Sequence, residues 1–358
     1  MRVHNHHILV LALCTLACGG SDGPIEPLPE TPTRTWRMGF SAIPPKPDEQ
    51  VLLANLEMWT QRADAAIMHV SPPWAALLSG TSATTAVNAN ELPLANYYRA
   101  KNLQVVVMVD ATDGLNRAAE APELVQLGRS ISEPEVQLAY RQFVLALATI
   151  VRPEYIGLAA ETNLIRLSAP APLYAALVQM VNAAVSDLRL APVSTKPYVS
   201  VQVDVAWGRP AANPVYDGVE RDFADFPFVE ALGLSSYPYF VWADPDEIPL
   251  DYYSRLPNGR SIPVLVVEGG WTSGAAGGIT SSMEKQARYV RRQAGMLDSA
   301  RARAVFQLTF SDLDVPSLNL PPGSILPLFA SLGLVDTELR PKPALAVWDS
   351  LFAIRRQS

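Results

Sequence analysis

The sequence predicts an α/β fold, a single (β/α)8 barrel that follows a signal peptide and a Pro-rich tether. Short apolar runs alternate eight times with longer segments, and 49% of the 358 residues are hydrophobic, which is enough for a large buried core. Strands that alternate with helices are typical of parallel βαβ units. Eight such units fit a closed barrel better than an open doubly wound sheet, which is the alternative.

The predicted strands are short apolar runs, and amphipathic segments between them predict the helices. In chain order the strands are Arg37–Ser41, Ala66–Val70, Gln104–Val109, Tyr155–Ala160, Val199–Val205, Ala231–Ser235, Pro263–Val267 and Ala304–Thr309. The main helices are Glu49–Ala63, Pro134–Ile150, Ala171–Leu188, Ser282–Asp298 and Pro343–Ile354. No glycine-rich phosphate-binding motif opens a helix after the first strand, which argues against a nucleotide-binding fold.

The N-terminus has the pattern of a secretory signal peptide. Arg2 precedes a short apolar stretch, Ile8–Ala17, which ends in small residues before Cys18. A cysteine in this position resembles the bacterial lipoprotein signal, in which it becomes the lipidated first residue of the mature chain. We therefore expect a signal peptide at residues 1–17 and a lipid anchor on Cys18. The protein would then be extracytoplasmic and held at the bacterial cell envelope, with plain secretion as the alternative.

The rest of the chain divides into a linker and one domain. Residues 18–35 contain four prolines among Gly, Ser and acidic residues, a composition typical of an extended, semi-rigid linker. Residues 36–358 contain all eight predicted strands and would form the barrel domain. We expect this domain to be a monomer.

The composition excludes several kinds of chemistry. The only cysteines, Cys14 and Cys18, lie in the leader, so the folded domain has no disulfide and no thiol nucleophile. His69 is the one histidine outside the leader, which excludes a His-rich zinc site and leaves a Ser-His-Asp triad dependent on one residue. We therefore expect no metal and no cofactor. The net charge of -7, with scattered basic residues, argues against a nucleic-acid partner.

Two glutamates mark the expected site. Glu161 and Glu268 each end an apolar run just before a loop of small residues. The C-terminal ends of barrel strands form the face on which such enzymes carry their active sites, so both carboxylates would lie at one mouth. A retaining glycosidase needs two carboxyl groups there, one as acid and one as nucleophile.

The chain resembles the clan A barrel glycoside hydrolases, most closely their endo-β-1,4-galactanase-like branch. The likeness runs from Arg37-Met-Gly-Phe40 to Lys342-Pro-Ala-Leu-Ala-Val-Trp348. It implies a retaining hydrolase of β-linked poly- or oligosaccharides, with Glu161 as acid/base and Glu268 as nucleophile. The segment Gly233-Leu-Ser-Ser-Tyr237 matches the one whose tyrosine hydrogen-bonds the nucleophile.

One position departs from the clan pattern. The clan has Asn directly before the acid/base, where it binds the sugar 2-hydroxyl, and this chain has Ala160 there. Asn163, two residues after the glutamate, is the candidate to replace it. The departure favours a second hypothesis, a barrel that has lost catalysis and binds glycan. A lyase or isomerase is a third, but it would require a metal or a lysine at the strand ends.

Other residues near the predicted strand ends are candidates for substrate contacts. Trp74 and Trp271 follow the second and seventh strands and would suit stacking on a sugar, with burial in the core as the alternative. Asp110 follows the third strand and would bond a hydroxyl, with a helix cap or a salt bridge as the alternative. Asp204 has the same two interpretations. His69 is expected to be a strand-end residue whose ring nitrogens have hydrogen-bond partners.

Overall fold

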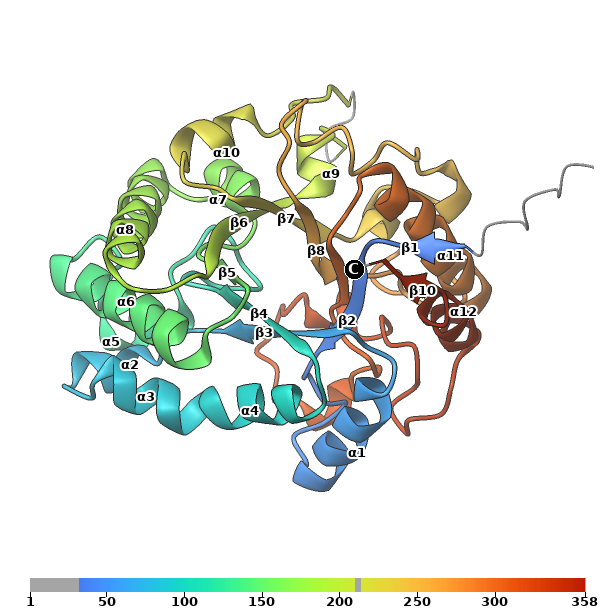
Figure 1. Ribbon diagram of the computed structural model, residues 1–358, viewed down its shortest axis with the longest axis horizontal. Coiled ribbons are helices and arrows are strands. Elements are labelled where there is room, and N and C mark those ends of the chain that lie inside the picture. Colours follow the sequence, from blue (N-terminus) through green and yellow to red (C-terminus); the bar gives the residue numbers. More distant parts are fainter. Residues whose placement is uncertain (1–31, 210–213, 358) are drawn as a thin grey trace, which may run out of the picture. The chain divides into compact units, whose positions relative to one another are not determined.

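The barrel predicted from the sequence is confirmed by a computed structural model, which describes residues 32–209 and 214–357 (Figure 1). Eight parallel strands close in chain order, with each strand bonded to its neighbours and the last to the first. They are β2 (Arg37–Ser41), β3 (Ala65–Val70), β4 (Gln104–Val109), β5 (Tyr155–Gly157), β6 (Lys196–Gln202), β7 (Ala231–Ser236), β8 (Val264–Gly269) and β9 (Ala304–Gln307). The expected signal peptide, the lipidation site Cys18 and the linker up to residue 31 lie outside the described residues.

Helices surround the strands (Figure 1). The α-helices are α1 (Glu49–Thr60), α2 (Trp74–Leu78), α3 (Ala83–Asn90), α4 (Leu92–Ala100), α5 (Pro122–Leu127), α6 (Pro134–Ala146), α7 (Thr162–Ser168), α8 (Ala171–Leu190), α9 (Val203–Ala206), α10 (Glu220–Asp225), α11 (Met283–Ser299) and α12 (Pro343–Phe352). Short 3-10 helices are η2 (Pro238–Phe240), η3 (Pro245–Glu247), η4 (Val315–Ser317) and η5 (Leu326–Phe329), and the π-helix η1 (Leu147–Val151) continues α6. In the described part of the chain, none of these helices is both long and apolar enough to cross a membrane.

Side chains fill the inside of the barrel, as expected for eight strands. Large members of this inner cluster are Ile67, Met108, Tyr155, Tyr198, Leu265 and Phe306, all almost fully buried. Alternate residues point outward and pack under the helices in a second, larger core. Gly157 leaves the space that Tyr198 occupies, since a Cβ atom there would lie 2.7 Å from the Tyr198 ring.

Three strands end earlier than the sequence predicts, and the smallest difference is at β9, which ends at Gln307 rather than Thr309. β5 ends at Gly157, three residues before the expected end. β6 ends at Gln202, because the Gln202 side chain accepts a hydrogen bond from the Val205 N–H at 2.7 Å and so caps the short helix α9. Asp204, expected at the strand end, therefore lies on a helical turn.

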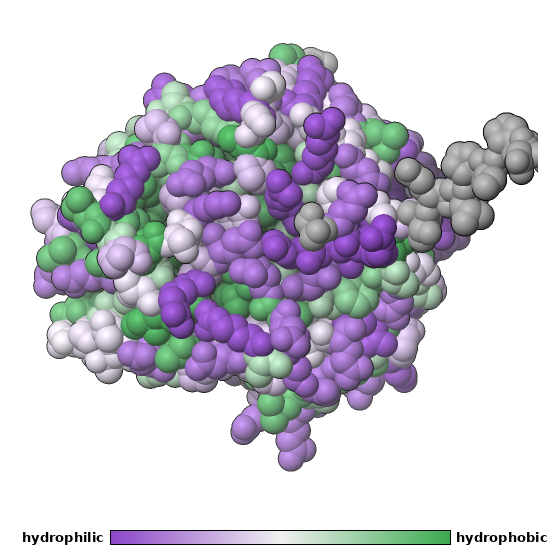
Figure 2. Space-filling model, viewed as in Figure 1, coloured by the Kyte–Doolittle hydropathy of each residue, from purple (hydrophilic) through white to green (hydrophobic). Residues whose placement is uncertain are grey.

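The first described residues already belong to the fold. Thr33 and Arg34, expected in the linker, form β1 (Thr33–Arg34), which pairs in parallel with β10 (Arg355–Arg356) near the C-terminus. The buried Arg34 guanidinium donates to Asp64 at 2.7 Å and to the carbonyl of Ile354. On the face shown in Figure 2, hydrophilic residues predominate and hydrophobic ones are scattered between them.

Candidate active site

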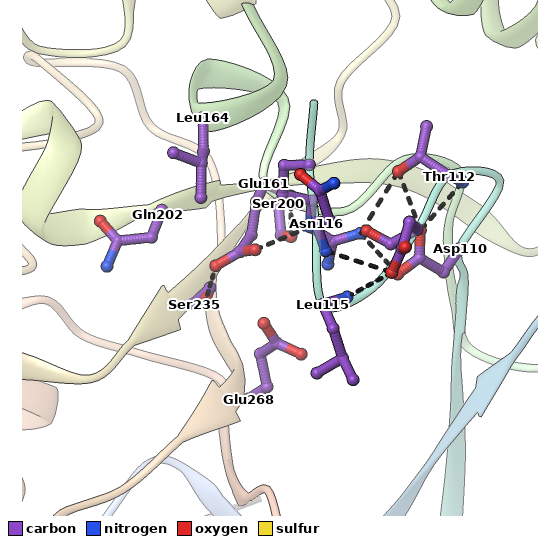
Figure 3. A network of polar contacts seen from close by, with 12 residues as sticks. Asp110, Thr112, Leu115, Asn116, Glu161, Leu164, Ser200, Gln202, Ser235 and Glu268 are labelled. Atoms are coloured by element: carbon purple, nitrogen blue, oxygen red, sulfur yellow. Dashed lines mark hydrogen bonds and ion pairs between the residues drawn. The ribbon is translucent and has the colours of Figure 1, made fainter. Parts of the chain in front are cut away.

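A cavity of about 670 Å³ opens where the barrel strands end. It is lined by residues at or after the C-terminal ends of all eight barrel strands, in agreement with the usual position of barrel active sites. The polar side chains that line it are His69, Asp110, Arg117, Glu161, Gln202, Asp204, Tyr237 and Glu268. The two glutamates singled out from the sequence therefore share one cavity, and Figure 3 shows their side chains directed toward a common space.

Glu161 is held by donors on both carboxylate oxygens. Its Oε1 accepts from the Ser235 hydroxyl at 2.6 Å, and its Oε2 accepts from Nε of Arg117 at 2.8 Å. The backbone at Glu161 is left-handed (φ 50°), and its N–H donates to the Ser200 hydroxyl at 2.9 Å. A left-handed conformation is unfavourable for a residue with a Cβ atom, and such strain is frequent at functional sites.

Arg117 is a functional residue that the sequence did not reveal. Its buried guanidinium joins Glu161 to Asp110, since Nε lies 2.8 Å from Glu161 Oε2 and Nη1 lies 2.6 Å from Asp110 Oδ2. Burial disfavours the cation, but the charges of Asp110 and Glu161 raise the pKa of Arg117 above its ordinary value. Arg117 lies in the loop between β4 and α5, where no spacing or motif distinguishes it from a surface arginine.

Glu268 has a different environment. It lies in β8, next to a register shift in the pairing with β7, and its side chain is 14% exposed. Burial, reinforced by the negative charge of Glu161, raises the pKa of Glu268 to about 7, although Arg117 acts in the opposite direction. The charge of each glutamate therefore affects the other. Of the two glutamates, only Glu161 is in contact with the buried Arg117.

His69 does not have the hydrogen-bond partners that were expected. Neither ring nitrogen is bonded within the described residues, and Nε2 lies 3.7 Å from Oε2 of Glu268. Burial lowers the pKa of His69 to about 4, so the ring is neutral near pH 7. The His69 side chain lines the cavity wall and is 21% exposed, although both ring nitrogens are themselves buried.

Tyr237, Asp110 and Asp204 also line the cavity. The Tyr237 ring packs against Phe329 with centroids 4.9 Å apart, and no hydrogen bond joins it to Glu268 among the described residues. Asp204 accepts hydrogen bonds from Tyr252 and from Gln202, and burial raises its pKa to about 6. In the described ranges no cluster of His, Cys, Asp and Glu side chains could hold a metal ion.

Three residues proposed from the sequence to bind sugar do not line the cavity. Trp74 is 1% exposed and stacks on Tyr140, and Trp271 is 2% exposed and donates to the Ser281 hydroxyl. Asn163 is buried, and its side-chain amide accepts a hydrogen bond from the Gln202 N–H at 2.8 Å and donates one to the Gln202 carbonyl at 2.9 Å. The two tryptophans are core aromatics, and Asn163 fixes the start of α7 to the end of β6, so it does not replace the asparagine missing at Ala160.

Comparison with known proteins identifies the fold. No protein-family model and no curated protein matches the sequence. Among solved structures, a variant of GH5_18 from Bifidobacterium longum in complex with Manb1-4GlcNAc has a TM-score of 0.60 at 14% identity, over 90% of this chain and 80% of that one. An exo-beta-1,4-mannosidase from an Opitutaceae bacterium has a TM-score of 0.59 at 17% identity, over 89% of this chain and 59% of that one.

A third similar structure is relevant to the branch suggested by the sequence. The GH53 catalytic domain of Ignisphaera aggregans has a TM-score of 0.58 at 15% identity and covers 94% of this chain and 99% of that one. This match indicates a galactanase-like branch only weakly. Together the similar structures show that this chain has the barrel fold of the clan A glycoside hydrolases.

Proposed function

We propose that the protein is a retaining glycoside hydrolase that cleaves β-linked glycans. The observation that carries this proposal is the pair Glu161 and Glu268, two carboxyl groups that line one cavity and have unlike surroundings. Glu161 would protonate the leaving oxygen while Glu268 attacks the anomeric carbon. Glu161 would then deprotonate the water that releases the sugar from Glu268.

The environment of the pair adds a feature to this mechanism. In the free protein Arg117 contacts Glu161, whereas burial and the charge of Glu161 raise the pKa of Glu268 to about 7, so Glu268 carries a proton in about half of the molecules near pH 7. The proposed roles use the arrangement in which the same proton is on Glu161. Whether the proton is on Glu161 or on Glu268, the pair has one proton and the same net charge. The environment therefore determines only the fraction of molecules in which the proton is on Glu161 and the reaction can begin.

The similar structures support a β-hexoside as substrate. Two of them have Manb1-4GlcNAc bound, one is an exo-beta-1,4-mannosidase and another is a beta-glucuronidase. The carboxylates and the other polar side chains that line the cavity would bond the hydroxyls of one such sugar.

Substitution of each glutamate tests the proposal. Glu161→Gln and Glu268→Gln should each lower turnover by about 10³-fold or more on any glycan that the wild type hydrolyses, because each removes a reacting group. Reducing-end release from a panel of β-linked glycans measures this. Glu91→Gln is the matched control, since Glu91 is also buried with a pKa raised to about 7 but does not line the cavity. Wild-type turnover in Glu268→Gln would refute the assignment.

Two observations favour a second candidate, a barrel that binds glycan without cleaving it. Arg117 forms an ion pair with the expected acid, and Ala160 replaces the asparagine that binds the sugar in the clan. Such a protein would bind glycans from the same panel and release no reducing ends from any of them.

A further inference from the structure

The cavity contains two kinds of surface. Apart from Arg117, the charged and hydrogen-bonding groups come from residues at or just after the strand ends, whereas most of the remaining lining is aliphatic or aromatic. We call the apolar part the apolar wall and define it by Leu115, Phe240, Ile325, Leu326, Leu328 and Phe329. Three of these residues belong to η5, Ile325 directly precedes η5, Phe240 ends η2, and Leu115 lies in the loop that also provides Arg117.

The apolar wall begins directly beside the two glutamates. Tyr237 connects the two regions, because its ring packs against Phe329 at 4.9 Å and against Phe240 at 6.2 Å. Tyr237 lines the same cavity as Glu161 and Glu268, and it directly follows β7, the strand that pairs with β8 where Glu268 lies. A ligand whose sugar reaches the glutamates therefore extends along the wall.

Contacts within the fold hold the apolar wall together. Phe240 and Phe329 contact each other edge to face with centroids 5.5 Å apart. The Tyr239 hydroxyl donates to the Leu328 carbonyl at 3.1 Å and so joins η2 to η5. These contacts hold the apolar side chains in place before any ligand arrives.

The chemistry of the wall does not suit a chain of sugars. Each hydroxyl placed against it would lose water without gaining a partner, which is unfavourable. The tryptophans that would suit stacking on a sugar, Trp74 and Trp271, are in the core and do not line the cavity. Leu115 and Ile325 line the cavity and remain 39% and 42% exposed, so a ligand that covers them with apolar surface gains from the hydrophobic effect.

We propose that the cavity takes a β-glycoside with an apolar aglycone, an alkyl or aryl group that lies on the apolar wall while the sugar faces Glu161 and Glu268. This inference rests on the proposed function, since it places the scissile bond between the glutamates and the aglycone along η5. It assigns Leu115 and Ile325 a role in selecting the substrate.

The test compares ligands that differ only in the length of the alkyl group. Methyl and hexyl β-glycosides of mannose, galactose and glucose are titrated by calorimetry into the full chain carrying Glu268→Gln, so that binding is measured without turnover. For the sugar that binds, the hexyl glycoside should bind on the order of 100-fold more tightly, which corresponds to burial of three to four methylene groups. Affinities within about threefold of each other would overturn the proposal.

Variants of the apolar wall test whether its side chains cause the preference for the hexyl group. Leu115→Ser with Ile325→Ser, added to the same protein, should reduce the ratio of hexyl to methyl affinity by about tenfold. Leu53→Ser is the control, since Leu53 is 53% exposed and does not line the cavity, and it should leave the ratio unchanged. An unchanged ratio in the double variant would overturn the assignment of the wall.

Parallel assays with the wild type separate this inference from the proposed function. A preference for hexyl glycosides without hydrolysis of any substrate would support the inference and refute the hydrolase. Hydrolysis of unsubstituted oligosaccharides without any preference for hexyl glycosides would support the hydrolase and overturn the inference.

Discussion

Glu161 and Glu268 are the same residue type in one cavity, but their contacts differ. Glu161 accepts from Arg117 and Ser235, whereas Glu268 lies beside His69, whose pKa is lowered to about 4 and whose ring is therefore neutral near pH 7. When two carboxyl groups have different surroundings, their pKa values differ, and one can act as an acid while the other acts as a base. The direct contact with Arg117 is present at Glu161 and absent at Glu268 in the described residues.

This arrangement predicts the pH dependence of hydrolysis. The pair must keep one proton to protonate the leaving oxygen, and the pKa of Glu268, raised to about 7, marks where that proton is lost. Below pH 7 the proton is present, so kcat/KM should fall about tenfold per pH unit only above about pH 7. Rates measured between pH 5 and 9 would check this, and a value that stays constant up to pH 9 would contradict it.

The sequence revealed some site residues and concealed others for physical reasons. A carboxylate that ends an apolar run is conspicuous, so Glu161 and Glu268 could be found. Arg117 could not, because its role depends on how one loop folds over the cavity. The prediction that Trp74 and Trp271 contact the substrate was wrong, because the position of an aromatic residue after a strand does not determine the direction of its ring.

At the scale of elements, all eight strands were predicted, because buried parallel strands are continuous apolar runs. Their ends were less predictable. Val203–Ala206 continues the apolar run of β6, and only the capping bond from Gln202 turns it into a helix. The apolar wall was not predicted, since η5 lies in a proline-containing loop that has no strand or helix periodicity.

The packing inside the barrel gives a prediction about stability. Gly157→Ala would place a Cβ atom 2.6 Å from Met108 and 2.7 Å from Tyr198, so it should lower the free energy of unfolding by about 2 kcal/mol. Urea denaturation measures the change. Gly295→Ala is the control, because there the Cβ atom meets only the half-exposed Leu250 and alanine favours the helix. Equal losses in both variants would contradict this account of the barrel interior.

At the scale of the whole molecule, we propose that the barrel is anchored in the bacterial envelope through Cys18, the lipidation site expected from the sequence. Cys18→Ser should move the protein from the membrane fraction to a soluble fraction, because the lipid is the proposed attachment. Fractionation of a bacterial host, with immunodetection of the protein, measures this. The same distribution for wild type and variant would show that Cys18 is not the anchor.

Covalent trapping is the most direct test of the proposed chemistry, in which Glu268 forms a bond to sugar inside the barrel. Activated 2-deoxy-2-fluoro β-mannosides, β-galactosides and β-glucosides slow the release of such an intermediate, so that it accumulates. Mass spectrometry of the wild type should find one sugar per molecule on the peptide that contains Glu268, and none on Glu268→Gln. An enzyme that hydrolyses the parent glycosides but gives no adduct, or gives it on another peptide, would contradict the mechanism.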